Sequence, residues 1–399
     1  MPPDAGSTAQ SARRPGALIV GGDYQGLGIV RSLGRRGVPT CVLDDERSIA
    51  KYSRYTSHAV AAGDLRAQED VVSTVLETGR RLGLDGWVLY PTRDETVAAF
   101  SRHRSRLAEQ FRVPTPPWET VRQAWDKRAT YARAQQLDIP VPRTWYPATA
   151  DELREIDGQP PFAIKPAIKE HFIYATGSKA WKARTRAELP ALYERAARLV
   201  GPGEVMIQEL VPGDGRQQFA YCAFFKDDRA PAKMVVRRRR QHPPEFGRSS
   251  TYVETVDLPL LETLSERFLR SIGYYGLAEL EFKLDPRDGR YKLLDVNART
   301  WGYHTIGTKA GVDFPYLLYA DQLGEPAGAS CARSGVRWIR LATDLPTAVV
   351  ESLHGRLDWR AYGRSVVSSD VESVFSWRDP LPGLAELMLL PYLAFKRGF

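Results

Sequence analysis

The stretch Gly276–Asn297, GLAELEFKLDPRDGRYKLLDVN, decides the fold of this 399-residue chain. Two runs of alternating apolar and polar residues flank the sequence Pro286-Arg287-Asp288-Gly289. Glycine stands there at the point where a hairpin turn needs a positive φ. The pattern therefore predicts two antiparallel strands joined by a tight turn, with Arg287–Gly289 as a three-residue loop.

Four polar side chains fall on one face of this hairpin. With a three-residue loop, Glu281 lies opposite Asp295 and Glu279 lies opposite Asn297, and the two-residue period of a strand puts all four on the same side. Opposed like charges destabilise a sheet unless a cation compensates them. Oxygen-only ligands favour a hard ion, Mg²⁺ or Mn²⁺. The alternative is a solvated face with scattered charge.

The first segment of the chain alternates strand-like and helical patterns, which predicts a parallel sheet. Strands are expected at Ala17–Gly21, Val38–Leu43 and Trp87–Tyr90, and helices after the glycine turn to about Arg36 and from Asp94. The glycines at 21, 22, 26 and 28 do not have the dinucleotide spacing G-x-G-x-x-G. We therefore expect a Rossmann-like domain over residues 16–115 in which this turn is a structural connection and NAD is not bound.

Beyond this segment the pattern changes at a proline-rich linker, Pro114–Pro117. An amphipathic helix is expected over Val121–Leu137, followed by short alternating strands and helices to about Val211. A strand-rich block, Gln217–Asn297, comes next. The end of the chain, Leu384–Phe395, is apolar and contains a proline, which fits either a packed terminal helix or a partner surface.

The composition is that of a soluble globular protein, with 43% hydrophobic and 26% charged residues. We expect a disordered leader over residues 1–15, no transmembrane segment, and a reducing cytoplasmic location, since the three cysteines are odd in number and lack metal spacing. The net charge of +8 admits anionic partners, but Arg237–Arg240 would alternate between the two faces of a strand and carries no nucleic-acid motif. No nucleic acid is therefore expected as a partner.

Five short motifs follow one another along the chain. They are Asp126-Lys127 with Ile139–Pro142, Phe162–Ala167 around Lys165, Gly177–Ala180 around Lys179, Met206–Gly213, and Leu294–Gly302. In this order they resemble the motifs of the ATP-grasp superfamily, most closely its carboxylate–amine ligase-like branch, which includes D-aspartate ligases. The resemblance covers roughly residues 16–325, which is most of the chain.

The resemblance implies an α/β fold with α+β elements. A Rossmann-like pre-ATP-grasp domain, residues 16–115, would precede a two-lobed ATP-grasp domain, residues 116–330, whose lid lobe spans about 145–210. Residues 331–399 would form a C-terminal appendage. The sequence leaves a homodimer open.

The same resemblance implies that the chain binds ATP and Mg²⁺ (or Mn²⁺). The metal ligands would be Glu281, Asp295 and Asn297. The phosphates would be contacted by Lys127 and Lys165, with Lys179 as a further candidate. The adenine strand would comprise Gln208, Glu209, Leu210 and Val211, and the ribose would be bound by Asp214, with Gln217 and Gln218 as alternatives.

Three arginines and Lys165 are the candidates for catalysis. Arg299 lies two residues beyond Asn297 on the same strand face and would stabilise the acyl phosphate or the tetrahedral intermediate; the alternative is an ion pair with the hairpin acids. Arg238 and Arg240 would share a face and clamp a substrate carboxylate. Gln241–Ser250 resembles the loop that covers the site in this branch.

Two departures from the family pattern concern the phosphate site. Asp295 stands where the family more often has glutamate. The segment Ile168–Thr176, expected as a loop, has no glycine and offers Lys169, His171 and Tyr174 instead. Phosphate binding would then depend more on side chains than on backbone amides.

The function implied is an ATP-dependent ligase. It would activate a small-molecule carboxylate as an acyl phosphate and couple it to an amine, with an amino-acid-like substrate and release of ADP and phosphate. The alternative is a non-catalytic or regulatory ATP-binding protein on the same fold. Substrate specificity is expected in the first domain's loops, including Pro91–Glu95, and in the covering loop.

Overall fold

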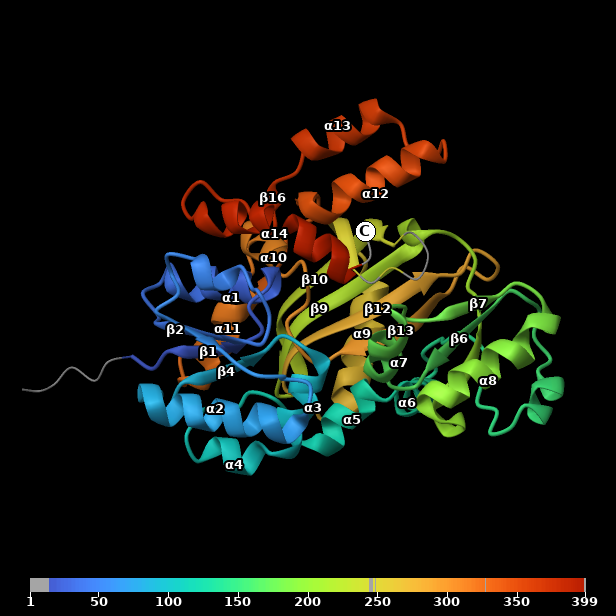
Figure 1. The fold of residues 1–399 in the computed structure, drawn as a ribbon, viewed down its shortest axis with the longest axis horizontal. Helices are drawn as coiled ribbons and strands as arrows, with labels where there is room; N and C mark the ends of the chain where they lie inside the picture. The colour runs from blue at the N-terminus through green and yellow to red at the C-terminus, as the bar shows by residue number, and fades with distance from the viewer. Residues whose placement is uncertain (1–13, 244–246, 248, 327, 398–399) are drawn as a thin grey trace, which may run out of the picture.

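The computed structural model describes residues 14–243, 247, 249–326 and 328–397. Three sheets organise these residues: a parallel sheet near the N-terminus, a large mixed sheet in the middle, and a small antiparallel sheet at the opposite side of the molecule (Figure 1). The expected leader lies outside the described residues except for Arg14 and Pro15. Within the described ranges, no helix combines the length and apolar character that crossing a membrane requires.

The first sheet is parallel and four-stranded, in the order β3-β2-β1-β4. Its strands are β1 (Ala17–Val20), β2 (Thr40–Asp44), β3 (His58–Ala61) and β4 (Val88–Pro91), and its helices are α1 (Tyr24–Gly34), α2 (Gln68–Leu82), α3 (Asp94–Arg102) and α4 (Arg104–Ala108). The chain crosses from β3 to the far side of β1, so the carboxyl ends of β1 and β4 flank the point where the strand order reverses. Ligands of such sheets bind at this switch point.

The glycine turn after β1 is a structural connection. Gly21 has a φ of +98°, and a Cβ there would lie 2.1 Å from the hydroxyl oxygen of Thr92. The amide of Gly22 donates to Asp44 at 2.6 Å, and Asp23 caps helix α1. Only glycine allows this backbone conformation and this close approach of two loops.

The central sheet has eight strands, and the predicted hairpin forms one of its edges. The order is β13-β12-β9-β10-β11-β15-β16, with β14 paired to β10. The strands are β9 (Gln218–Lys226), β10 (Arg229–His242), β11 (Ser249–Val256), β12 (Gly276–Leu284), β13 (Tyr291–Asn297), β14 (Ser330–Cys331), β15 (Arg337–Ile339) and β16 (Val371–Glu372). Helices α9 (Pro259–Ser271), α10 (Thr305–Ala310) and α11 (Phe314–Gln322) accompany them.

The first domain and the central sheet share a hydrophobic core. Leu27 and Ile29 of α1 belong to the same buried cluster as Val236 of β10, Trp301 and Trp338. A second cluster covers the other face of the sheet and includes Leu261 and Phe268 of α9. Because the first of these cores joins two parts of the chain, the switch point of the parallel sheet is held in place against the central sheet.

The small sheet, in the order β5-β8-β6-β7, lies in the segment that is predicted to form the lid lobe. It contains β5 (Thr144–Trp145), β6 (Phe162–Pro166), β7 (Trp181–Ala183) and β8 (Val205–Glu209), with α7 (Lys169–Thr176) and α8 (Leu189–Val200). The segment expected as a loop over 168–176 is therefore largely helix α7. The side chains of Lys169 and His171 lie outside the described part of the chain.

The helix expected over Val121–Leu137 is two helices, α5 (Trp118–Trp125) and α6 (Lys127–Gln136). The prediction of one helix is wrong because Asp126 adopts an extended conformation and accepts from the amide of Arg128, which makes it the N-cap of α6. This break has a consequence for the site, since it places Lys127 at the first helical position.

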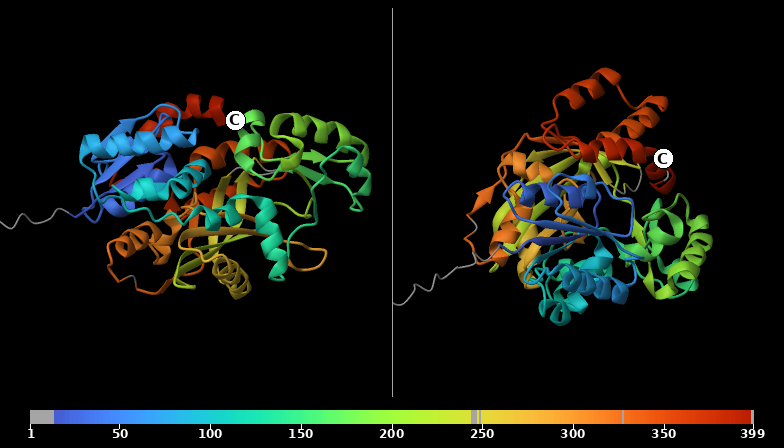
Figure 2. Two further views of the ribbon diagram at one scale, coloured as in Figure 1. Left: turned by 90° about the horizontal axis from the view of Figure 1, so that it is seen from below. Right: turned by 60° about the vertical axis from the view of Figure 1, so that its left-hand side comes forward.

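The chain beyond β15 forms α12 (Leu341–Leu353), α13 (Trp359–Val367) and α14 (Leu381–Arg397). Helix α12 packs against β10 and β11, and α13 lies beyond it at the periphery of the molecule in Figure 1 and in the right-hand view of Figure 2. Strands β15 and β16 of the same segment pair into the central sheet. The division into domains at residues 115 and 330 stays a prediction.

Candidate active site

A cavity of about 300 Å³ lies where the first domain, the lid helix α7 and the central sheet meet. The switch-point loop Thr92–Glu95 lines it from one side, and Tyr174 of α7 lines it from another. The central sheet contributes the predicted site residues Arg238, Glu281 and Asn297. Arg299 lies just beyond β13, and Lys179 lies between α7 and β7. The structure thus gathers residues from two of the five motifs, Gly177–Ala180 and Leu294–Gly302, around one space, together with Arg238 and the loop region Thr92–Glu95.

The acidic residues of the hairpin pair as predicted, although the loop length differs from the prediction and a bulge interrupts β13. Glu279 lies opposite Asn297 and Glu281 lies opposite Asp295. The loop is one residue longer than predicted, since Leu284 pairs with Tyr291. A bulge then adds one residue to β13 between the partners of Glu281 and Phe282, and this restores the expected register.

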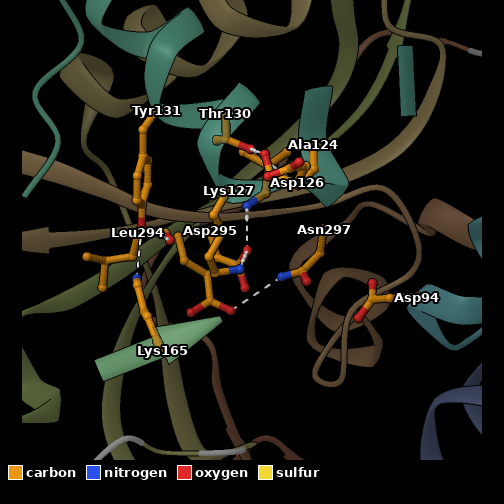
Figure 3. Close-up of polar contacts among 12 residues, drawn as sticks. Asp94, Ala124, Asp126, Lys127, Thr130, Tyr131, Lys165, Leu294, Asp295 and Asn297 are labelled. Carbon is orange, nitrogen blue, oxygen red and sulfur yellow. Dashed lines mark hydrogen bonds and ion pairs between the residues drawn. The ribbon is translucent and has the colours of Figure 1, made fainter. Parts of the chain in front are cut away.

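The bulge residue is Leu294, and its carbonyl points to helix α6. Tyr131 donates its hydroxyl to this carbonyl at 2.9 Å and accepts from Lys165 Nζ at 2.9 Å (Figure 3). Burial raises the pKa of Tyr131 to about 12. A bulge frees backbone groups from the ladder, so this tyrosine both stabilises the bulge and positions the lysine.

The two phosphate-site lysines lie close to the acidic hairpin. Lys127, only 7% exposed, donates to Asp295 Oδ1 at 2.6 Å. Lys165 projects from β6 of the lid lobe toward the same region (Figure 3). Burial lowers the pKa of Lys165 to about 8, and the charge of Asp295 opposes that shift. Both cations are therefore placed beside a carboxylate that is predicted to hold the metal.

Hydrogen bonds and a basic side chain compensate the negative charges of Glu279 and Glu281 on the hairpin face. Asn297 donates to Glu279 at 3.0 Å and to Glu281 at 3.4 Å. Burial, reinforced by the charge of Glu281, raises the pKa of Glu279, while the hydroxyl of Tyr303 donates to Glu279. Arg238 contacts Glu281 at 3.2 Å. The three acids face each other as predicted, and hydrogen bonds and basic side chains hold them in place.

These residues fit a hard divalent cation by their chemistry. Glu281, Asp295 and Asn297 supply only oxygen ligands, and Lys127 and Arg238 compensate the two carboxylates with positive charge. Among the described residues, no three His, Cys, Asp or Glu side chains are grouped around a metal position. The predicted set relies on an amide for its third ligand.

Arg299 forms a bidentate ion pair with Asp94 of the first domain. Its Nε lies 2.8 Å from Oδ1, and NH2 lies 3.0 Å from Oδ2. Burial opposes the charge of Arg299, but Asp94 outweighs this and raises the pKa of the guanidinium. The partner is thus the first residue of α3 and not one of the hairpin acids that the alternative predicts.

The prediction that Arg238 and Arg240 share one face is wrong. Arg238 pairs with Val253 and Arg240 pairs with Tyr252, so Arg239 is an extra residue in a bulge and the alternation is broken. Arg238 lines the cavity, whereas Arg240 forms a bidentate pair with the buried Asp344 at 2.9 and 2.7 Å. Arg240 therefore anchors helix α12.

The segment predicted to bind adenine begins in β8 and continues past its end, and its residues are not among those that line the cavity. Gln208 is buried and donates to Thr144, and the amide of Glu209 donates to the carbonyl of Arg143. The carboxylate of Glu209 accepts from Lys292 at 3.1 Å. Val211 is buried and its carbonyl accepts from Lys283 at 2.8 Å. These positions, together with Leu210, stay a prediction for adenine binding.

The ribose candidates lie near the end of this strand. Asp214 caps a short turn and pairs with Arg216 at 3.0 Å. Of the alternatives, Gln218 accepts from Arg238. The covering loop Gln241–Ser250 falls partly on residues 244–246 and 248, which lie outside the described residues.

Two residues of the site were not foreseen in their roles. Tyr131 lies four residues after Lys127, so both fall on one face of α6, and that spacing is a signal that could have identified it. Asp94 was expected only within a specificity loop. Its pairing with Arg299 joins positions 205 residues apart, which a single sequence does not reveal.

The three sheets, the lid lobe and the lysine-bearing strand facing an acidic hairpin define an ATP-grasp fold. The predicted fold class and the predicted resemblance are confirmed by the comparisons with known proteins. The chain is similar to D-aspartate ligase from Enterococcus faecium, with 24% identity over 77% of this chain and 76% of that protein. No family model matches the sequence.

Solved structures show the same fold. An L-amino acid ligase from Bacillus licheniformis aligns with a TM-score of 0.60 at 17% identity, over 77% of this chain and 74% of that one. The biotin carboxylase domain of 2-oxoglutarate carboxylase from Hydrogenobacter thermophilus, described as a dimer in complex with MgADP, ADP and bicarbonate, aligns with a TM-score of 0.62 at 14% identity, over 80% and 73% of the two chains.

Proposed function

We propose that this chain is an ATP-dependent ligase that activates a carboxylate as an acyl phosphate and couples it to an amine, with release of ADP and phosphate. The proposal rests on one observation, namely that the residues predicted to bind Mg-ATP lie next to a cavity. Lys127 and Lys165, which are of the type that bind ATP phosphates, lie beside Asp295 of the acidic hairpin. Other acids of the same hairpin line a cavity that the first domain's switch point also lines. The similarity to D-aspartate ligase supports the same enzyme class.

ATP and Mg²⁺ are the cofactors of this proposal. Glu281, Asp295 and Asn297 would hold the metal, which would neutralise phosphate charge when bound. Lys127 and Lys165 would contact the phosphates, with Lys179 on the cavity side. The ion pair between Lys127 and Asp295 keeps both groups compensated in the protein alone. Mn²⁺ in place of Mg²⁺ stays a prediction.

The chemistry has two steps, each assisted by positioning and charge. A carboxylate oxygen of the substrate attacks the γ-phosphorus of ATP, and ADP leaves. The amine nitrogen then attacks the acyl carbon, loses a proton, and phosphate leaves with the former carboxylate oxygen. Arg238 and Arg299 line the cavity, and in this proposal they would stabilise the negative charge that develops in each step. Asp94 positions Arg299.

The cavity wall fits an amino-acid-like substrate because it carries both signs of charge. Arg238, Arg299 and Lys179 line it together with Asp94 and Glu95. Basic side chains would bind a carboxylate, and acidic ones would bind an ammonium group. A homodimer and a cytoplasmic location stay predictions.

Two alanine variants test the proposal. Lys165→Ala and Asp295→Ala are expected to abolish formation of ADP from Mg-ATP without changing the circular dichroism spectrum. Lys309→Ala and Asp288→Ala, at an exposed helix position and in the exposed hairpin turn, are matched controls that retain turnover. Retained turnover in either site variant contradicts the assignment. ATP binding without turnover across a broad panel of carboxylates and amines supports the alternative, a regulatory ATP-binding protein.

A further inference from the structure

Helix α1 begins at the wall of the active-site cavity. Its first residue, Tyr24, lines the cavity together with Gly302 and Tyr303, which follow the acidic hairpin. Tyr24 is only 8% exposed, so most of its surface lies against other parts of the protein. The groups that surround this ring therefore decide the shape of the cavity wall at this point.

The guanidinium of Arg340 lies over the ring of Tyr24. Arg340 belongs to residues 331–397, which we call the C-terminal segment, and it is 2% exposed. Its central guanidinium carbon is 3.9 Å from the ring centroid, and a cation in this position is attracted by the ring face, more strongly where water is excluded. Its Nη2 donates to Glu386 of α14 at 2.8 Å, whereas Nε and Nη1 have no hydrogen-bond partner among the described residues. The contact with the ring therefore matters to the arginine as well as to the tyrosine.

Trp338 of the same segment supports two tyrosines of the cavity wall. It is fully buried in β15, and its ring centroid lies 6.3 Å from that of Tyr24 and 6.3 Å from that of Tyr303. Its indole N–H donates to Thr305 at 2.9 Å, which fixes the orientation of the indole. Trp338 and Arg340 thus bring the C-terminal segment into contact with the wall of the cavity.

The hydroxyl end of Tyr24 is confined by the chain that follows the hairpin. A Cβ added to Gly302 would lie 2.5 Å from the hydroxyl oxygen of Tyr24. Gly302 is the last residue of the motif Leu294–Gly302, so this motif leaves room for the tyrosine. The ring is therefore held at its hydroxyl end by Gly302 and on one face by Arg340.

Arg340 is itself held firmly. Its amide donates to the carbonyl of Thr251 in β11 at 2.9 Å, and Glu386, which accepts from its side chain, is buried in α14. Burial disfavours the charge of Arg340, but Glu386 and Tyr24 outweigh this effect and raise the pKa of the guanidinium. A charged group of the C-terminal segment thus stays fixed against a ring of the cavity wall.

We infer that Tyr24 is a specificity-determining residue that contacts the amino-acid-like substrate, and that Arg340 positions it. The inference rests on the proposed function for the kind of substrate. Tyr24 follows the carboxyl end of β1, at the switch point where ligands of such sheets bind. A displaced ring changes the space that the substrate occupies. Lys127, Lys165 and Asp295 are not among the residues that line the cavity, so nucleotide binding should not depend on this ring.

Calorimetric titration of the full-length protein tests the inference without requiring turnover. The probes are the common amino acids in their L and D forms, titrated with and without Mg-ADP, and the one that the wild type binds most tightly is used for the variants. Tyr24→Leu, and Arg340→Met combined with Glu386→Gln, should each weaken its binding about tenfold and change Mg-ADP binding by less than about twofold. Arg340→Lys keeps a cation beside the ring and should retain binding within about threefold.

A matched double variant separates positioning from general destabilisation. Arg31→Met combined with Asp379→Asn removes another buried ion pair, 2.9 Å long, that joins α1 to the C-terminal segment. Neither residue is among the described residues that line the cavity. This variant is expected to lower the unfolding midpoint in urea, because it removes a buried pair, and to leave amino-acid binding unchanged.

Four results overturn the inference. They are a wild-type protein that binds none of the amino acids, unchanged amino-acid binding in Tyr24→Leu, a loss of Mg-ADP affinity as large as the loss of amino-acid affinity, and an equal loss of amino-acid affinity in the Arg31 and Arg340 double variants. Amino-acid binding that weakens as expected in a protein that forms no ADP supports this inference and contradicts the proposed function.

Discussion

Replacing Asp94 by alanine removes the carboxylate that accepts two hydrogen bonds from Arg299, and it tests how the first domain is joined to the segment that follows the acidic hairpin. The two side chains are 13% and 15% exposed, and their contacts are 2.8 and 3.0 Å long. Removing one member of a mostly buried, bidentate pair costs about 3–5 kcal/mol. Glu279 and Glu170 also act on Arg299 by their charge, so we expect the lower end, about 3 kcal/mol.

The measurement is a double-mutant cycle in urea. Asp94→Ala, Arg299→Ala and the double variant are unfolded at pH 7, with tryptophan fluorescence and far-ultraviolet circular dichroism as two probes of the transition. We expect a coupling free energy of about 2–3 kcal/mol. A coupling free energy below about 0.5 kcal/mol, which is the range of exposed pairs, would show that Asp94 and Arg299 do not join the two parts of the chain. Asp64→Ala is the internal standard, since Asp64 and Arg66 are 3.9 Å apart and largely exposed.

Three further predictions concern single groups. Burial lowers the pKa of His304 to about 4. The neutral imidazole therefore contributes its full stabilisation above the pKa of the unfolded chain, near 6.5, and this stabilisation is lost as the pH falls toward 4. Between pH 6.5 and 5, the free energy of unfolding in urea should fall by about 2 kcal/mol more for the wild type than for His304→Asn. Tyr174→Phe removes the 2.5 Å hydrogen bond from the lid helix to Glu95, and limited proteolysis should then cleave the lid lobe faster, whereas Glu95→Gln keeps an acceptor and should not. Gly28→Ala places a Cβ 2.4 Å from the ring of His304 and should destabilise the protein by about 1–3 kcal/mol, with an unchanged melting temperature as the contradicting result.

The sequence predicted the central hairpin well because its signals are local. Alternation and the glycine turn placed Glu281 opposite Asp295, and the structure confirms that pairing. The loop length was wrong by one residue, and the compensating bulge at Leu294 depends on Tyr131, which comes from a distant helix. Tertiary contacts of this kind leave no trace in strand periodicity.

The same limit explains the other errors. Strict alternation predicted a shared face for Arg238 and Arg240, and a bulge at Arg239 removed it. The single helix over Val121–Leu137 ignored the preference of Asp126 for a capping position, which is a local signal that could have been used. The ion pair of Arg299 with Asp94 could not be predicted, because it depends on how two domains pack.

Phosphate release by the purified protein tests directly whether the chain is an ATP-dependent ligase that forms an acyl phosphate. The protein is incubated with Mg-ATP and paired libraries of small carboxylates and amines, and the nucleotide products are separated. We expect ADP and phosphate in equal amounts, formed only when a suitable carboxylate and a suitable amine are both present. Formation of AMP and pyrophosphate, or ATP hydrolysis that is indifferent to both substrates, would contradict it.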